Sequence, residues 1–472
     1  MMKLNRKMYL DRVSACWIGK NIGGTMGAPY EGDPNMQDIS GFATPPGEPM
    51  PNDDLDLQII WLTAVEDRGI YSITPRVLGE YWLNYVVPYC NEYGNAKANM
   101  KLGLLPPYSG EYLNEQWKNS NGAWIRTEIW ACLFPGFPQY AVKYAYMDAC
   151  VDHGLGEGTY AAMFTAALES AAFFENDIRK LIDTGLSFIP KDCRVAKSVK
   201  LAIELYDKGV EFKEARNAIV KESEDLGLFQ APANLSFVIL GLLYGEGDYK
   251  KSMIYAINCG DDTDCTAATI GSIMGLMHGT EFVPKDWQEY IGDKIVSSYI
   301  DCAYPRREYT CTRLTERIYQ LVPSVLKAHE IYMEYTDGET ERVEAPELFI
   351  TDHEMATTGL SIHFPDLIWA KGRVEFDKHT VRPGDTLKLD FIFSNTLNDT
   401  KQIRVKLHLP ESWTADREDV NLYVREMRYR SKDKQSAVVT VGEIVKGMNK
   451  INIEISSPGR LTSTVVPLII WG

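Results

Sequence analysis

Apolar residues in the first two thirds of the chain recur with the period of an α-helix. Leu57, Ile60, Trp61 and Ala64 follow one another at helical spacing, and an alanine-rich run occupies residues 161–172. The segment from residue 235 to 243 is apolar on nearly every side, which predicts a fully buried helix. Strand-like alternation is nearly absent before about residue 328. We therefore predict an all-α domain over residues 1–328.

One of these predicted helices carries a stripe of small side chains. Ala267, Gly271, Gly275 and Gly279 fall at every fourth position, so they share one helical face. Because small side chains let a neighbouring backbone approach closely, we expect a second helix to pack against this face.

Residues from about 85 to 140 follow neither pattern. They are rich in Tyr, Trp, Asn, Gly and Pro and have weak periodicity. A long irregular segment inside a helical domain is typical of a functional loop or lid.

After about residue 330 the apolar positions alternate with other residues, as they do in β-strands. The alternating positions are Leu387, Leu389, Phe391 and Phe393, then Ile403, Val405, Leu407 and Leu409, then Ile451, Ile453 and Ile455. Turn-forming residues at 383–384 and 410–413 separate these runs. A chain of 472 residues exceeds the usual size of one domain, so we predict a second domain at 329–472, an Ig-like β-sandwich.

The overall charge limits the partners. The formal net charge is −16, which argues against nucleic acid because no surplus of basic residues can meet phosphates. The nine cysteines include no C-x-x-C pair and fit buried, reduced thiols. No signal peptide or membrane-spanning stretch is evident, so we expect a cytoplasmic protein without a membrane partner.

Two acidic quartets point to chemistry. Asp53-Asp54-Leu55-Asp56 and Asp261-Asp262-Thr263-Asp264 both read D-D-x-D, and both stand at expected helix starts. One aspartate is enough to cap a helix, whereas clustered carboxylates are costly to bury unless a cation neutralises them. Oxygen-only ligands select hard cations. The quartets therefore predict a binuclear metal site.

Several motifs of the helical region resemble those of the ADP-ribosylglycohydrolase family. Residues 260–268, continuing to Gly271 and Gly279, are similar to the family's C-terminal metal motif. Residues 52–54 are similar to its Thr-Asp-Asp motif, and residues 12–31 to its opening helix and turn. The resemblance covers residues 8 to 325. It implies an all-helical fold with two Mg²⁺ ions, for which Mn²⁺ can substitute.

The resemblance also implies roles for individual residues. The metal ligands would be Asn52, Asp53, Asp54, Asp262, Asp264 and Cys265. The catalytic residues would be Asp54, Asp264 and Glu31, the last similar to a glutamate that gates the metal site. The substrate-binding residues would be Asn121, Gly122 and His153. From sequence alone, the first two are equally well interpreted as turn residues. A histidine such as the third is more often a hydrogen-bonded core residue.

The chain departs from the family pattern at three positions. Asn52 and Cys265 replace threonine ligands, and sulfur is a poor partner for Mg²⁺. Gly24 stands where the family often has aspartate. Asp56 and Asp261 are extra carboxylates that would compensate for the lost ligands. These departures imply an altered metal geometry and leave open a substrate other than ADP-ribose on protein.

The function that the motifs favour is metal-assisted hydrolysis of an N- or O-glycosidic bond in an ADP-ribosyl or related ribosyl or furanosyl substrate, free or protein-linked. The resemblance implies that one ion grips vicinal ring hydroxyls and the other holds the attacking water. One alternative is a prenyl or terpenoid synthase, although its usual D-D-x-x-D spacing is absent. Another is a binding protein with a degenerate metal site. The sequence names no partner for the sandwich.

Overall fold

The computed structural model describes residues 1–300, 309–345, 360–364, 367–397, 399–425 and 432–472. The chain forms two compact units, Met1–Glu347 and Leu348–Gly472. The first is helical and the second is built from antiparallel sheets, which confirms the predicted fold class of an all-α domain followed by a β-sandwich. The boundary after residue 328 stays a prediction, and residues 329–345 lie within the first unit.

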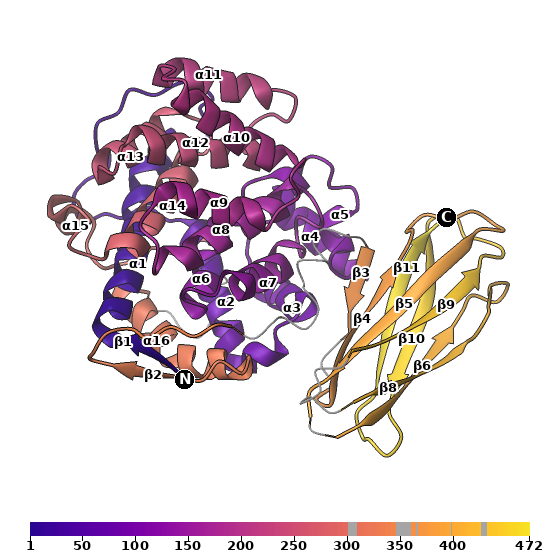
Figure 1. Ribbon diagram of the computed structural model, residues 1–472. Helices are drawn as coiled ribbons and strands as arrows, with labels where there is room; N and C mark the ends of the chain where they lie inside the picture. Colours follow the sequence, from indigo (N-terminus) through magenta and orange to yellow (C-terminus); the bar gives the residue numbers. More distant parts are fainter. Residues whose placement is uncertain (301–308, 346–359, 365–366, 398, 426–431) are drawn as a thin grey trace. The chain divides into compact units, whose positions relative to one another are not determined.

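The helices of the first unit are labelled in Figure 1. They are α1 (Arg6–Gly27), α2 (Asp53–Arg68), α3 (Pro75–Tyr85), α4 (Asn91–Lys101), α5 (Tyr108–Glu111), α6 (Glu128–Leu133), α7 (Pro138–Ala149), α8 (Glu157–Ala172), α9 (Ile178–Ser187), α10 (Arg194–Asp207), α11 (Phe212–Glu222), α12 (Ala231–Tyr244), α13 (Tyr249–Asn258), α14 (Thr263–His278), α15 (Lys285–Ile291) and α16 (Cys311–Ala328). Short 3-10 turns are η1 (Ala28–Tyr30), η2 (Ile70–Ser72), η3 (Trp117–Asn119) and η4 (Trp124–Arg126). No helix among these combines the length and apolar character needed to cross a membrane.

Among the described residues, helices α1 and α14 share the most extensive helix–helix contact of the domain, and they lie side by side in Figure 1. A Cβ added to Gly19 would lie 2.3 Å from the carbonyl oxygen of Gly271, and one added to Gly27 would lie 2.3 Å from that of Thr263. These contacts run in opposite directions along the two helices, so the pair is antiparallel. The small-residue stripe predicted on α14 therefore meets a matching stripe on α1, and the contact brings the end of α1 to the start of α14.

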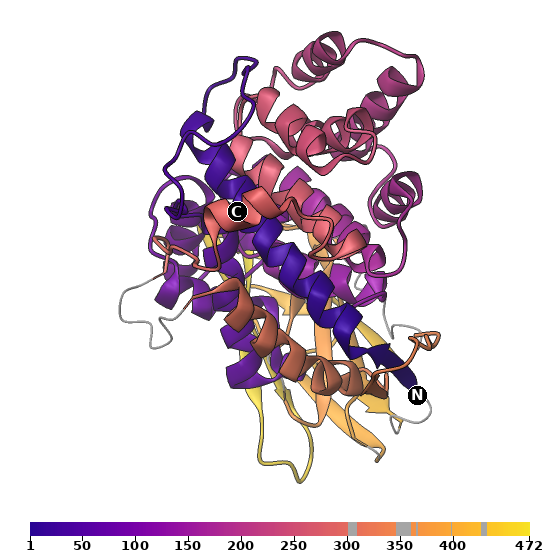
Figure 2. The same ribbon diagram turned by 90° about the vertical axis from the view of Figure 1, so that its left-hand side faces the viewer.

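The helical domain also contains a short parallel two-stranded ribbon, which the hydrophobic periodicity did not predict. Strand β1 (Met2–Asn5) pairs with β2 (Met333–Thr336), and the register runs from Met2 opposite Met333 to Asn5 opposite Thr336. Figure 2 shows the indigo α1 rising from this end beside the orange-brown α16, against which it packs.

The segment from residue 85 to 140 is more ordered than its composition indicates. It contains α4, α5, η3, η4 and α6, and residues 120–137 are all buried. The prediction of a long irregular lid is therefore wrong for this part of the segment. Its order comes from tertiary contacts, described below, that no local periodicity reveals.

The second unit consists of two antiparallel sheets. Its strands are β3 (Leu360–His363), β4 (Ala370–Phe376), β5 (Thr386–Asn395), β6 (Lys401–His408), β7 (Thr414–Ala415), β8 (Asp419–Val424), β9 (Lys432–Thr440), β10 (Met448–Ser456) and β11 (Thr464–Trp471). One sheet has the order β11-β10-β6-β8 and the other β3-β4-β5-β9-β7. The alternating residues predicted for β5, β6 and β10 are buried, except that Leu409 follows the end of β6 and is only partly covered.

Candidate metal centre

Two helix N-termini meet at the candidate site. Helix α2 is capped by Asn52, whose Oδ1 accepts a hydrogen bond from the backbone nitrogen of Asp54 at 2.8 Å. Helix α14 follows Asp262, and its first turn contains Asp264 and Cys265. The thiol of Cys265 donates to Asp54 Oδ1 at 3.3 Å, so the two acidic quartets share one cluster. The positive ends of both helix dipoles face this cluster and partly offset its negative charge.

Residues at the start of α14 provide one group of candidate ligand atoms. Asp262, Asp264 and Cys265 each offer one ligand atom, and these three atoms lie within 4.8 Å of one another. Asp262 Oδ1 and Asp264 Oδ1 are buried and have no hydrogen-bond partner among the described residues. A buried carboxylate oxygen without a partner is costly, and a divalent cation would satisfy both atoms. The donor set therefore fits a metal ion.

The carboxylates also raise one another's pKa. Burial, together with the charges of Asp262, Glu31 and Asp54, raises the pKa of Asp264 well above its usual value. Burial raises the pKa of Asp54 to about 8, although Lys20 acts against this rise. Burial is also the main cause of the raised pKa of Asp53. Like charges in a buried space disfavour ionisation, and a bound cation would reverse that preference.

The two extra carboxylates hold loops. Asp56 Oδ2 accepts hydrogen bonds from the backbone nitrogens of Ser298 and Tyr299 at 2.8 and 2.7 Å. Asp261 has a left-handed backbone (φ 66°), and its Oδ1 accepts a hydrogen bond from the backbone nitrogen of Phe229 at 2.8 Å. Both carboxylates thus position segments beside the site. Their expected compensation for lost metal ligands stays a prediction.

Gly24 and Asn52, both noted in the sequence as expected departures from the resembled family, are in direct contact. The carboxamide of Asn52 packs directly against Gly24, where an added Cβ would lie 1.7 Å from Asn52 Nδ2. Any larger side chain at residue 24, aspartate included, would therefore displace Asn52 from its present place. Asn52 can occupy its place only because residue 24 is a glycine.

A buried lysine lies beneath the cluster. Lys20 Nζ lies 3.2 Å from Asp54 Oδ2 and 2.6 Å from Glu128 Oε1. Gln58 Nε2 donates to the other oxygen of Glu128 at 2.8 Å. Burial disfavours the charge of Lys20, but the carboxylates of Asp54 and Glu128 outweigh it and raise the pKa of Lys20. This ammonium group is a fixed positive charge within the candidate centre.

Glu31 stands at the outer edge of the site. The residue follows η1 and is exposed, unlike the aspartates. Partial desolvation of its carboxyl group, together with the charges of Asp262 and Asp53, raises the pKa of Glu31 to about 7. The carboxyl group of Glu31 therefore interacts electrostatically with the buried aspartates, and its role as a gating group stays a prediction.

Asn121 supports the cluster from the side. Its Nδ2 donates to Asp262 Oδ2 at 2.6 Å, and its Oδ1 accepts from Trp124 Nε1 at 3.0 Å. The next residue, Gly122, has no room for a side chain, because an added Cβ would lie 2.3 Å from Glu92 Oε1. Asn121 thus fixes one oxygen of Asp262 and leaves the other without a partner.

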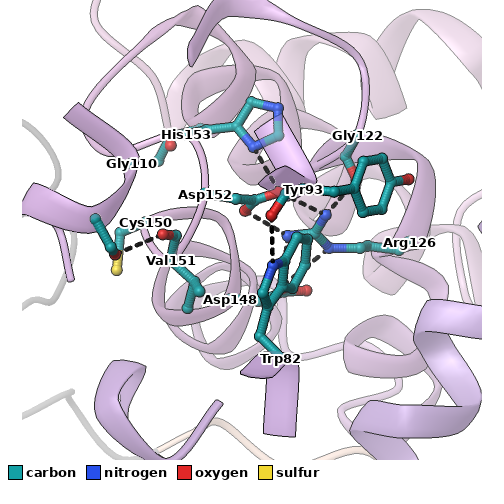
Figure 3. A network of polar contacts seen from close by, with 12 residues as sticks. Trp82, Tyr93, Gly110, Gly122, Arg126, Asp148, Cys150, Val151, Asp152 and His153 are labelled. Atoms are coloured by element: carbon teal, nitrogen blue, oxygen red, sulfur yellow. Dashed lines mark hydrogen bonds and ion pairs between the residues drawn. The ribbon is translucent and has the colours of Figure 1, made fainter. Parts of the chain in front are cut away.

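An arginine holds this segment in place (Figure 3). Arg126 is fully buried and donates to the carbonyl oxygen of Gly122 at 2.7 Å and to Asp152 Oδ1 at 2.7 Å. It also donates to Asp148 Oδ1 at 3.0 Å and lies over the ring of Trp82. Although burial opposes ionisation, Arg126 and His153 lower the pKa of Asp152 to about 2. Arg126 thus joins Gly122, Asp148 and Asp152 through buried hydrogen bonds.

His153 lies behind the same segment. It is fully buried, its Nε2 is 2.9 Å from Ser120 Oγ, and its Nδ1 is 3.1 Å from Asp152 Oδ2. In Figure 3 it lies beside Asp152, on the side of Gly122. These contacts make it a support for the segment that carries Asn121, and a direct contact with substrate stays a prediction.

Sequence analysis did not single out several residues that shape the site. Lys20 has a recognisable signal, because it is the one charged residue between Arg12 and Glu31. Tyr93, whose hydroxyl donates to Asp53 Oδ2, has no comparable signal, since aromatic residues are frequent throughout its neighbourhood.

Fold and site together define a mainly helical domain with a buried cluster of carboxylates at two helix N-termini. The chain belongs to the ADP-ribosylglycohydrolase family, because the model of that family matches residues 5–324. This match confirms the resemblance seen in the motifs and identifies the helical domain as one of a glycohydrolase family. It does not favour the alternative of a prenyl synthase.

Solved structures give two comparisons. The chain is similar to an ADP-ribosylglycohydrolase-related protein complex at 19% identity and a TM-score of 0.46, over 68% of this chain and 99% of that one. It is also similar to the GAE domain of yeast GGA1 at 12% identity and a TM-score of 0.17, over 24% of this chain and 100% of that one. No curated protein matches the chain.

Proposed function

We propose that this protein is a metal-dependent hydrolase that cleaves an N- or O-glycosidic bond of an ADP-ribosyl or related ribosyl or furanosyl substrate. The observation that carries the proposal is the pair of buried, unpartnered oxygens on Asp262 and Asp264, which lie beside Cys265 at the start of α14. Family membership supports the glycohydrolase class. A cation site of this kind is the part of the domain best suited to hydrolysis.

The residues proposed to hold two divalent cations, Mg²⁺ or Mn²⁺, come from both quartets. They are Asp53, Asp54, Asp262, Asp264, Cys265 and Asn52. The Oδ1 atom of Asn52 already accepts one hydrogen bond and has a second lone pair for a ligand role. When bound, such ions polarise substrate oxygens and lower the pKa of water.

The protein's own groups would divide the remaining tasks. Asp54 and Asp264 accept the proton of the attacking water, since each has a carboxylate oxygen directed into the cluster. Asn121 keeps Asp262 in one orientation through its 2.6 Å hydrogen bond. Glu31 closes the site from the rim. Gly122 lets the backbone beside Asn121 pass close to Glu92, and His153 holds this segment from behind.

Activity on a panel of ribosides tests the proposal. Hydrolysis of ADP-ribosyl adducts or simpler ribosides should require Mg²⁺ or Mn²⁺ and vanish with a chelator. A 2-deoxyribosyl analogue should react far more slowly, because only a vicinal diol can be gripped by a cation. Asp54→Asn and Asp264→Asn should lower kcat by at least about 10²-fold while binding changes less.

Two outcomes would reject the proposal. Full activity in chelator, or equal rates on the 2-deoxyribosyl analogue, would contradict hydrolysis through a metal and a diol. Metal binding without hydrolysis of any riboside in the panel would instead favour a binding protein with a degenerate site.

A further inference from the structure

The thiol of Cys265 lies among the carboxylate oxygens of the candidate centre. Its Sγ is one of three ligand atoms within 4.8 Å of one another, the others belonging to Asp262 and Asp264. The residue is 4% exposed and is not in a disulfide. The N-cap and first turn of α14 thus bring one sulfur and two carboxylates close together.

The carboxylates beside this thiol lack partners. Asp262 Oδ1 and Asp264 Oδ1 are buried, in residues 4% and 5% exposed, and accept no hydrogen bond from the described residues. Asn121 already occupies the other oxygen of Asp262. A cation bound between these two oxygens would satisfy both, and it would lie close to the Sγ atom of Cys265.

The donor set decides which cation fits. Mg²⁺ demands oxygen ligands, whereas a thiolate selects softer ions such as Zn²⁺, Co²⁺ and Fe²⁺. Resting on the proposed function, in which the site holds divalent cations, we propose that Asp262, Asp264 and Cys265 bind a thiophilic divalent cation in preference to Mg²⁺. The sulfur is a direct ligand, and its proton passes to solvent when the bond forms.

The side of the cluster formed by Asp53 and Asp54 favours a different class of cation. Asp53 and Asp54 offer carboxylates only, with Lys20 holding one oxygen of Asp54. Hard cations suit these groups. The centre is therefore asymmetric, and the asymmetry comes from a single atom, the Sγ of Cys265.

A purely structural role for the thiol makes a different prediction. In that role Cys265 only donates its 3.3 Å hydrogen bond to Asp54 Oδ1, which a serine hydroxyl would also donate. Cys265→Ser therefore keeps the hydrogen bond but removes the soft ligand. Cys193→Ser is the matched control, because Cys193 is a buried cysteine that caps α10, and serine is a good cap.

Cobalt provides the probe. The metal-free full-length protein is titrated with Co²⁺ while the near-ultraviolet thiolate-to-cobalt charge-transfer band is recorded, and affinities for Co²⁺, Zn²⁺ and Mg²⁺ are measured by calorimetry. The wild-type protein and Cys193→Ser should show the band and bind Co²⁺ and Zn²⁺ more tightly than Mg²⁺. Cys265→Ser should lose the band, and its affinity for Co²⁺ should fall by at least about 10-fold, as expected when a metal site is impaired.

The results separate the inference from the function on which it rests. Cobalt binding without the band, at the same affinity in Cys265→Ser, would overturn the role of sulfur and leave the metal site standing. Failure of the wild-type protein to bind any of these ions would overturn both. If Cys265→Ser does not fold, the wild-type band alone decides, since its presence supports direct ligation and its absence refutes it.

Discussion

The ammonium nitrogen of Lys20 lies 3.2 Å from Asp54 Oδ2, and neither side chain is exposed. Glu128 lies on the other side of the ammonium at 2.6 Å, so one buried cation is shared by two carboxylates. Lys20 therefore offsets part of the negative charge of the cluster from below. This leaves Asp54 Oδ1 on the side of Cys265.

Removing this charge should destabilise the metal-free protein. In Lys20→Met, Asp54 and Glu128 lose a buried partner, and breaking a buried ion pair typically costs about 3–5 kcal/mol. The free energy of unfolding, measured by urea titration in the presence of a chelator, should fall by that order. Added Mn²⁺ should recover part of the loss, because the cation takes over the compensation of Asp54.

Lys208→Met is the matched control, since Lys208 pairs with Glu204 on an exposed helix face. This variant should leave the urea concentration at the unfolding midpoint unchanged, because surface ion pairs contribute little to the free energy of unfolding. The double variant Lys20→Met/Asp54→Asn should be more stable than Lys20→Met alone. Equal stabilities of Lys20→Met and the wild type would show that the ion pair between Lys20 and Asp54 does not stabilise the fold.

Asn121→Ala should lower the affinity for metal while lowering the free energy of unfolding only slightly. The variant removes the 2.6 Å hydrogen bond that orients Asp262, and partners of this kind are typically worth about 10–100-fold in metal affinity. Calorimetric titration with Mn²⁺ measures the loss. Asn84→Ala, on the exposed face of α3, is the control and should bind Mn²⁺ as the wild type does. An unchanged affinity in Asn121→Ala would separate Asn121 from the centre.

The helical domain should fold without the sandwich if the chain ends in the right place. Strand β2 pairs with β1, and Lys3 pairs with Glu341, so a chain ending at Ala345 keeps contacts that a chain ending at Lys327 loses. The longer chain should unfold cooperatively by circular dichroism and bind Mn²⁺, while the shorter one should have a lower Tm. Aggregation of the longer chain under conditions in which the full chain is soluble would make the sandwich a structural cover.

Much of the fold is predictable because its signals are local. The acidic quartets stand at the starts of α2 and α14, since aspartate favours helix N-termini. The small-residue stripe on α14 predicted a close helix contact, and the contact exists. The partner helix was not predictable, because a stripe shows that something approaches without showing which segment it is.

The support of the site was less predictable, since its partners are far apart in the sequence. Lys20 pairs with Asp54 and Glu128, and the three residues come from three separate helices. Arg126 orders its own segment by binding Asp148 and Asp152. A composition rich in glycine and aromatic residues looks like a loop, because the interactions that order it are tertiary.

The pairing of Gly24 with Asn52 gives the sharpest test of local packing. In Gly24→Ala the new Cβ would lie 1.7 Å from Asn52 Nδ2, so Asn52 must leave its place and release the cap on α2. Overpacking of this kind typically costs about 1–3 kcal/mol. Asn52→Ser removes the clashing amide and keeps a capping oxygen, so Gly24→Ala should cost much less in the Asn52→Ser background. A double-mutant cycle by urea unfolding measures this coupling, because the energies of contacting residues are not additive.

Gly41→Ala is the control, since an added Cβ there meets nothing within 4 Å. Additive effects at residues 24 and 52 would contradict the arrangement, and strong coupling would show that asparagine at residue 52 depends on glycine at residue 24.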